Sequence, residues 1–330
     1  MVPLTGGCAM AEQSKDRLEF EAAVRSGSTC DEVKESVAEV RQGSLVAARQ
    51  VAAAETCVAA SQPGRLVEVY DAMVEGWFGQ APSAPAVVGP RSEPVEVGSA
   101  FFDALFAMVN DPDLGSDPTQ ITVSTTELAG ELSDSLFAEV RAQATSYPGV
   151  VDAARGGLPD RFELADLERC PQDSLGGHLH TLVVEEGFDL EVLDRDALGL
   201  RDLEPPLNYL NTRILQCHDV WHEVAGYETT GLHEIAISAF QMGQFGHHYS
   251  SLFLAMTQTT AAFTQPVEGS VLLLDVVLSS YRHGRQTPPL LGVRWEDLFS
   301  QPIEQIRAEL GVEAYASPYD PGLLEMLRHG

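Results

Sequence analysis

Apolar residues recur along most of the chain with the three- and four-residue spacing of α-helices, and the strict alternation of a β-strand is almost absent. The strongest helical patterns span residues 207–225 and 232–258, and Gly226 and Gly231 bracket the turn between them. Weaker helical patterns cover residues 15–77, 100–109, 125–144, 174–186 and 295–310. Residues 120–124 alternate as a strand would. The pattern therefore predicts an all-α fold, a multi-helix bundle.

Local signals place some helix ends. Ser174 is a suitable N-cap for the predicted helix at 174–186. The Asp111-Pro112 pair ends the predicted helix at 100–109. Polar residues that can cap a helix beginning near residue 32 are Ser28, Thr29 and Asp31.

A proline-rich segment, residues 79–98, has no helical period and is typical of a linker. It predicts a boundary between a helical N-terminal extension, residues 1–96, and a main domain. We place that domain at residues 97–316 and treat residues 317–330 as a C-terminal tail.

Charge and composition narrow the class of protein. The 330 residues carry 49 acidic and 20 basic side chains, a formal net charge of −29. Because nucleic acids are bound by clustered Lys and Arg, this balance argues against nucleic acid as a partner. The five cysteines form no CxxC pair, which indicates a reducing compartment. With no signal peptide or transmembrane pattern evident, we expect a cytoplasmic protein, soluble or peripherally bound to membranes.

One helical pattern is unusual for so acidic a chain. Between Glu234 and Glu268 lie 33 residues without Asp, Glu, Lys or Arg. Such a helix is either a central core helix or one wall of an apolar cavity. In the second interpretation, the small residues Gly243 and Gly246 leave room for a long apolar ligand.

The clearest chemical signal is His218-Asp219-Val220-Trp221-His222, followed after eleven residues by Glu234. Positions i and i+4 lie on one face of a helix, so the two imidazoles stand side by side. If the next helix packs back antiparallel, Glu234 returns opposite them and completes a site of two histidines and two carboxylates. His218, Asp219, His222 and Glu234 are therefore the predicted metal ligands and catalytic residues.

Two imidazoles with one or two carboxylates suit zinc, iron or manganese, and magnesium is less favoured. The pattern is not HExxH, and it has no second Glu-x-x-His copy, so a mononuclear site is favoured over a metalloprotease or a di-iron centre. A His-Asp doublet also occurs in HD-type phosphohydrolases, but their additional ligands have no convincing counterpart here.

Three further residues are candidates for supporting roles. His233, next to Glu234, is a candidate proton donor. Arg282 and Arg285 can bind an anionic head group, although basic residues at a helix C-terminus more commonly cap it. The His247-His248 pair is interpreted as structural.

With these residues in place, the chain resembles a known family, the fourth Coq component of coenzyme Q (ubiquinone) biosynthesis. The family signature, His-Asp-x-x-His-x11-Glu, is met by His218, Asp219, His222 and Glu234. Flanking motifs also match: Pro205-Pro206-Leu207-Asn208-Tyr209 before the signature and Tyr281-Arg282-His283-Gly284-Arg285 after it. The resemblance covers residues 97–316, and residues 1–96 have no counterpart in it.

The resemblance implies an all-α fold, a divalent metal, commonly zinc, and an adjoining cavity for a polyprenyl chain. It also implies action at ring carbon C1 of a polyprenylated 4-hydroxybenzoate, by oxidative decarboxylation and hydroxylation. The expected class is then a metal-dependent decarboxylase or lyase. The alternative is a non-catalytic scaffold that binds a polyprenyl lipid for other quinone-biosynthesis enzymes. Either role implies an isoprenoid lipid ligand, partner enzymes of the pathway and contact with a membrane surface.

Overall fold

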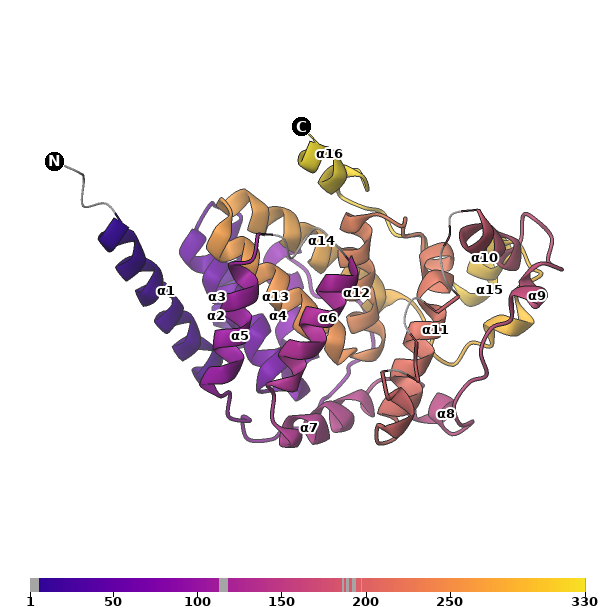
Figure 1. Cartoon of the computed structure of the whole chain (residues 1–330), viewed down its shortest axis with the longest axis horizontal. Helices are drawn as coiled ribbons and strands as arrows, with labels where there is room; N and C mark the ends of the chain where they lie inside the picture. Colours follow the sequence, from indigo (N-terminus) through magenta and orange to yellow (C-terminus); the bar gives the residue numbers. More distant parts are fainter. Residues whose placement is uncertain are drawn as a thin grey trace. The chain divides into compact units, whose positions relative to one another are not determined.

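The fold was analysed in a computed structural model that describes residues 6–112 and 118–329, apart from residues 186, 188, 189, 192, 193 and 197. The described residues form helices and connecting loops and contain no β-strand (Figure 1). An isolated bridge pairs Ser174 with Pro302. The predicted all-α class is confirmed.

The chain divides into two compact units, one of residues 1–81, 90–139 and 251–274, and one of residues 82–89, 140–250 and 275–330. The first unit contains α1 (Gly6–Ser26), α2 (Cys30–Val40), α3 (Leu45–Ala60), η1 (Pro63–Arg65), α4 (Leu66–Phe78), α5 (Ser99–Val109) and α6 (Pro118–Gly130). The second contains α8 (Val150–Ala154), α9 (Leu164–Leu167), α10 (Leu175–Val184), η2 (Leu200–Asp202), α11 (Leu207–Ala225), α12 (Gly231–Phe245), η3 (Trp295–Asp297), α15 (Ile303–Leu310) and α16 (Leu323–His329). Parts of both units occur in α7 (Asp134–Ala144), α13 (His248–Thr264) and α14 (Val267–Gln286).

In the first unit, α3 is the central helix, and every residue from 51 to 61 is buried. Helices α1, α2 and α4 pack around it. Phe20 on α1 makes edge-to-face ring contacts with Phe106 and Phe263, at centroid distances of 5.6 Å each. The segment 251–274 therefore shares its core with helices from the start of the chain, and the predicted boundary near residue 96 lies within the range of this unit.

Two predicted caps are present. The Thr29 side chain accepts a hydrogen bond from the Glu32 backbone N–H, and the Glu32 side chain accepts one from Thr29 N–H, which forms a capping box at α2. The Ser174 side chain accepts from Gly177 N–H at the start of α10. Helix α5 ends at Val109, just before Asp111-Pro112, as predicted.

In the second unit, α11 and α12 form a helical hairpin. Helix α11 spans the predicted residues, Leu207–Ala225, and ends at Gly226, whose φ of 79° is left-handed and favours glycine. Helix α12 then begins at Gly231, so five residues join the two helices.

Four element predictions were wrong. Residues 120–124 lie in α6 and are helical: Ile121 shares a helix face with the buried Thr125 and Leu128 at i+4 and i+7, whereas Val123 is 51% exposed. The pattern at 125–144 belongs to two helices, α6 and α7, separated by residues 131–133. The pattern at 295–310 is a short 3₁₀ turn, η3, followed by α15.

The predicted helix 232–258 is also two helices. Helix α12 ends at Phe245, Gly246 takes a left-handed φ of 64°, and α13 starts at His248. Hydrophobicity continues through the break because both helices are buried, so the apolar pattern alone did not reveal it.

The proposed ligand space at Gly243 and Gly246 is filled by protein. A Cβ added at Gly243 would lie 2.6 Å from Tyr281 O, because the backbone of α14 crosses there. A Cβ at Gly246 would lie 2.4 Å from the Tyr147 ring. These glycines therefore allow close packing, and the interpretation of α12 as a core helix is the one that the structure supports.

Candidate metal centre

One face of α11 carries the first three predicted ligands. One ligand atom from each of His218, Asp219 and His222 can be chosen so that all three lie within 4.8 Å of one another. The two ring Nε2 atoms are 3.0 Å apart. His222 is 2% exposed, whereas the His218 side chain is 24% exposed, so the centre has a buried side and an open side.

The fourth predicted ligand, Glu234, returns to this face from the first turn of α12. Its Oε2 lies 3.1 Å from His218 Nε2, and its Oε1 lies 3.3 Å from His222 Nε2. The short turn of the hairpin and the start of α12 at Gly231 place this carboxylate beside the two rings. The structure thus brings all four predicted residues together.

The other ring nitrogens have partners of their own. His222 Nδ1 lies 3.2 Å from the Tyr227 backbone O, which can only accept, so Nδ1 carries a proton, and in the neutral ring Nε2 keeps its lone pair. The Gln241 side-chain nitrogen lies 2.9 Å from His218 Nδ1. Sequence reasoning missed Gln241 as a site residue, although its position seven residues after Glu234, two turns along one face, is a usable signal.

The electrostatics of the cluster follow from burial and mutual contact. Burial raises the pKa of Glu234, but hydrogen bonds from His218 and His222 outweigh it and hold the pKa well below its usual range. Burial lowers the pKa of His218, and the hydrogen bond and charge of Glu234 more than offset this, so the net shift is upward. Burial raises the pKa of Asp219.

The donor set fits a divalent cation. With the ring neutral, the His222 Nε2 lone pair faces a carboxylate oxygen of Glu234, which also has only lone pairs to offer. The contact therefore needs either a proton on Nε2, as in the hydrogen bond above, or a cation between the two atoms. With neutral imidazoles, the two carboxylates of Asp219 and Glu234 give the centre a formal charge of −2. A partly buried group of this charge requires protons or a cation to offset it. Two imidazoles and two carboxylates are ligands for zinc, iron or manganese.

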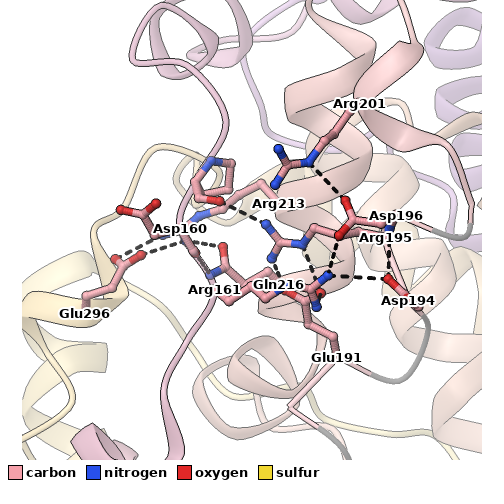
Figure 2. Close-up of polar contacts among 11 residues, drawn as sticks. Asp160, Arg161, Glu191, Asp194, Arg195, Asp196, Arg201, Arg213, Gln216 and Glu296 are labelled. Atoms are coloured by element: carbon pink, nitrogen blue, oxygen red, sulfur yellow. Dashed lines mark hydrogen bonds and ion pairs between the residues drawn. The ribbon is translucent and has the colours of Figure 1, made fainter.

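Helix α11 is held in place on the side of its N-terminal half by a polar network (Figure 2). Arg213 donates to Gln216 Oε1 at 2.6 Å, to Glu296 Oε1 at 2.9 Å and to the Val293 backbone O at 2.8 Å. Gln216 in turn donates to the Asp160 backbone O at 2.6 Å. These bonds fix the helix two residues before His218.

A cluster of ion pairs between charged side chains lies next to this network (Figure 2). Arg195 is 1% exposed and forms a two-pronged contact with Glu191. Arg161 donates to Glu191 Oε2 at 2.8 Å and also contacts Asp194 and Asp196. Burial lowers the pKa of Arg195 to about 10.

His233, the candidate proton donor, lies in a cluster of aromatic rings. It is 3% exposed, and its Nδ1 accepts a hydrogen bond from Glu228 N–H at 2.7 Å. Its ring centroid is 5.9 Å from that of Tyr227 and 5.7 Å from that of Tyr315. Burial lowers its pKa. These contacts hold the turn between α11 and α12.

The two arginines predicted for a head group differ in setting. Arg285 is 7% exposed, and its Nη2 donates to the Pro85 backbone O at 3.0 Å. Arg282 is half-buried. His247 is buried and pairs through Nδ1 with Ser250 Oγ at 2.9 Å, and burial lowers its pKa to about 3. His247 is thus a neutral side chain of the interior.

In the second unit, a cavity of about 250 Å³ is lined by residues that include Arg161, Phe162, Glu296 and Phe299, and by none of the four candidate ligands. The apolar cavity expected beside the ligands therefore stays a prediction. Among the described residues, no helix combines the length and hydrophobicity needed to cross a membrane.

The fold and the centre define a class: an all-α protein in which two helices of a hairpin present a cluster of histidines and carboxylates. Comparison with known proteins gives the family. Residues 159–316 match the model of the family described as "Coenzyme Q (ubiquinone) biosynthesis protein Coq4". This part of the chain, which contains all four candidate ligands, is similar to the Coq4 family.

Relatives agree with this assignment. The chain is 31% identical over 151 residues to a "Ubiquinone biosynthesis protein COQ4 homolog, mitochondrial" of Drosophila ananassae, a match that covers 44% of this chain and 53% of the relative. It is 26% identical over 156 residues to the COQ4 protein of Zygosaccharomyces rouxii, covering 47% of this chain and 45% of the relative. The chain thus spans about half the length of the curated relatives it matches.

Among solved structures, a putative ubiquinone biosynthesis protein from Nostoc punctiforme matches with a TM-score of 0.48 and 23% identity. The match covers 66% of this chain and 98% of the other.

Proposed function

We propose that this protein is a metal-dependent enzyme of ubiquinone biosynthesis that acts at ring carbon C1 of a polyprenylated 4-hydroxybenzoate. The observation that carries the proposal is the convergence of His218 Nε2, His222 Nε2 and both oxygens of Glu234 within a domain similar to the Coq4 family. Asp219 adds a fourth group to the same face. The metal is zinc, or alternatively iron or manganese.

When bound, the metal supplies a Lewis acid for the carboxylate or the neighbouring phenolic oxygen of the substrate. The residues of the chain hold and orient it. His222 is fixed through Nδ1 by the Tyr227 carbonyl, which keeps its Nε2 lone pair directed into the centre. For His218 to ligate through Nε2, its Nδ1 must carry the proton, and Gln241 Oε1 accepts a hydrogen bond from this Nδ1–H when the amide turns its oxygen toward the ring.

The open side of the centre is where substrate enters. Glu234 is 44% exposed and His218 is 24% exposed, whereas His222 lies inside. A substrate carboxylate approaching from this side meets the ligands without displacing the core. Replacing a ring carboxylate by a hydroxyl group is a two-electron oxidation that releases CO2, so the reaction also takes an oxidant, O2 or one from a partner protein.

The test is a turnover assay with substrate labelled at the carboxylate carbon. The metal-loaded wild-type protein releases labelled CO2 and forms the C1-hydroxylated ring. H222A loses roughly a hundredfold or more of this rate, since the loss of a ligand exceeds the 10–100-fold effect of its outer partners. H178Q is the control, because His178 on α10 pairs with Glu223 on α11, outside the centre.

Equal turnover by H222A and wild type contradicts the assigned site. Metal and a bound prenyl lipid without any CO2 release would instead support the alternative, a lipid-binding scaffold for other enzymes of the pathway.

A further inference from the structure

The two helices that carry the candidate ligands are held at their meeting ends by the C-terminal part of the chain. We define residues 303–329, from α15 through α16, as the C-terminal strap. We propose that three of its residues, Arg307, Tyr315 and Glu325, are positioning residues that fix the geometry of the metal centre. This inference rests on the proposed function, because it takes the four converging residues to be metal ligands.

The first anchor is Arg307 on α15. Its Nε donates to the Val224 backbone O at 2.9 Å, and its Nη2 donates to the Glu223 backbone O at 2.8 Å. These carbonyls belong to the last turn of α11, where backbone oxygens have no partner within the helix. A cation at a helix C-terminus also interacts favourably with the helix dipole. Arg307 therefore caps α11 directly after the ligand His222.

The second anchor is Tyr315. Its backbone N–H donates to the Ala225 backbone O at 2.8 Å, which satisfies the next carbonyl of α11. Its ring stacks on Tyr227 with a centroid distance of 4.6 Å and an interplanar angle of 20°. Because the Tyr227 carbonyl accepts the hydrogen bond of His222 Nδ1, this stack bears on the orientation of a ligand imidazole.

The C-terminal strap packs so closely against the turn after α11 that Gly226 has no room for a side chain. A Cβ on Gly226 would lie 2.8 Å from Ala314 Cβ and 3.2 Å from Tyr315 N. The phenol of Tyr227 is held by contacts to Ser280 Oγ at 2.7 Å and His283 Nδ1 at 2.8 Å. The turn after α11 is thus enclosed on both sides.

The third anchor is Glu325 on α16. Its Oε1 accepts a hydrogen bond from Gly231 N–H at 2.9 Å. Gly231 begins α12, and Thr230, at the N-cap position, makes no capping bond with its side chain. Glu325 therefore serves as the cap of α12, one turn before the ligand Glu234, and its negative charge suits a helix N-terminus.

The three anchors act on both ends of one five-residue turn. If the turn shifts, His222 and Glu234 separate, because one lies just before it and the other just after it. Loss of a partner that orients a metal ligand lowers metal affinity by about 10–100-fold. Substitution of an anchor residue should therefore lower the affinity of the centre for metal. Helix α16 lies beyond the matched residues 159–316, so Glu325 is a feature of this chain outside the family match.

The experiment measures zinc affinity by competition with a chromophoric chelator, together with hydrogen exchange of the amides of residues 226–231. In R307M and E325A, zinc affinity falls about tenfold or more and the turn amides exchange faster than in wild type. E325Q retains an acceptor oxygen and rescues the effect of E325A. Matched controls are R294M, which removes an exposed ion pair with Asp297, and E309A, which removes an exposed contact within α15.

Wild-type affinity and exchange in both R307M and E325A would overturn the inference. Should R307M not fold by circular dichroism, R307K takes its place, since one ammonium cannot bond two carbonyls in the manner of the guanidinium. If the wild-type protein binds no zinc, iron or manganese, the proposed function fails. The exchange data then decide separately whether the strap holds the turn.

Discussion

His222 is constrained at both ring nitrogens, and this makes it the most rigidly placed of the candidate ligands. Nδ1 is committed to the Tyr227 carbonyl, and Nε2 faces Glu234 Oε1. His218 is more exposed, and its Nδ1 meets the side chain of Gln241, which can rotate. The two imidazoles therefore differ in how firmly their contacts hold them.

The raised pKa of His218 gives a prediction for the metal-free protein. A group with a raised pKa in the folded state adds stability that is fully present below its unfolded pKa, about 6.5 for histidine. That stability is lost as the pH rises through the higher folded value. We therefore expect H218Q to destabilise the metal-free protein more at pH 6 than at pH 8. Urea unfolding of both proteins at the two pH values measures this, and an equal or larger loss at pH 8 contradicts the assigned Glu234–His218 pairing.

Burial decides the contribution of the ion pairs near α11. Arg195 is 1% exposed and Glu191 is 7% exposed, so R195M leaves a carboxylate short of one partner in the interior. Breaking a buried pair costs about 3–5 kcal/mol. Arg161 also contacts Glu191, so we expect a loss at the lower end of that range. The comparison variant is R201M, because Arg201 is 60% exposed and an exposed pair contributes about 0–1 kcal/mol. Equal unfolding free energies for the two variants would refute the role of burial here.

Residue spacing was enough to find the four converging groups, because i, i+4 geometry and a short turn fix where His218, His222 and Glu234 lie. It did not find Gln241 or the carbonyl of Tyr227. Gln is common on helix faces, and a backbone carbonyl leaves no signal in sequence. These partners depend on the packing of α11 against α12, which only the structure provides.

At the scale of elements, α12 and α14 cross at glycines. Gly243 on α12 lies against the backbone of α14. Conversely, a Cβ added to Gly284 on α14 would lie 2.4 Å from the backbone O of Phe240 on α12. Each helix thus offers a glycine where the other approaches. This arrangement explains why glycines stand in the interior of two buried helices despite their low helix propensity.

Replacement of one of these glycines tests the crossing. In G243A the new methyl group would meet Tyr281 O at 2.6 Å, and backbone cannot move aside cheaply. We expect a loss of about 1–3 kcal/mol in unfolding free energy, the usual cost of overpacking. G130A is the matched control, because its added Cβ has open space and the change stays within about 1 kcal/mol. A G243A protein as stable as G130A would show that the helices do not pack this closely.

Helix boundaries were predicted well where turn chemistry marks them. Helix α11 ends at Gly226 and α2 begins after Thr29 because a left-handed glycine and a capping box are local signals. The break at Gly246 was missed because apolar residues continue on both sides. The strand predicted at 120–124 failed because five residues are too few to separate the period of a strand from that of a helix.

At the scale of the whole molecule, the family match and the compact units have different limits. The family model matches residues 159–316, whereas the motifs in the sequence predict a resemblance over residues 97–316. The first unit combines residues from the start of the chain with residues 251–274. Such long-range pairing leaves no trace in a hydrophobic pattern, since each helix shows only that one of its faces is buried.

The overall charge bears on how the protein would contact a membrane surface. At −29, the chain cannot be drawn to an anionic membrane by charge. Contact with a lipid surface would therefore depend on exposed apolar side chains. On α16, Met326 is 54% exposed and Leu327 is 66% exposed, beside the residue that caps α12.

The most direct test of the account is the metal content of the purified protein and of its ligand variants, measured by elemental analysis with native mass spectrometry. The account predicts one equivalent of zinc, iron or manganese in the wild-type protein and in H178Q, and loss of that metal in H222A and E234A. A metal-free wild-type protein, or variants that keep the full equivalent, would contradict the assignment of His218, Asp219, His222 and Glu234 as a metal centre.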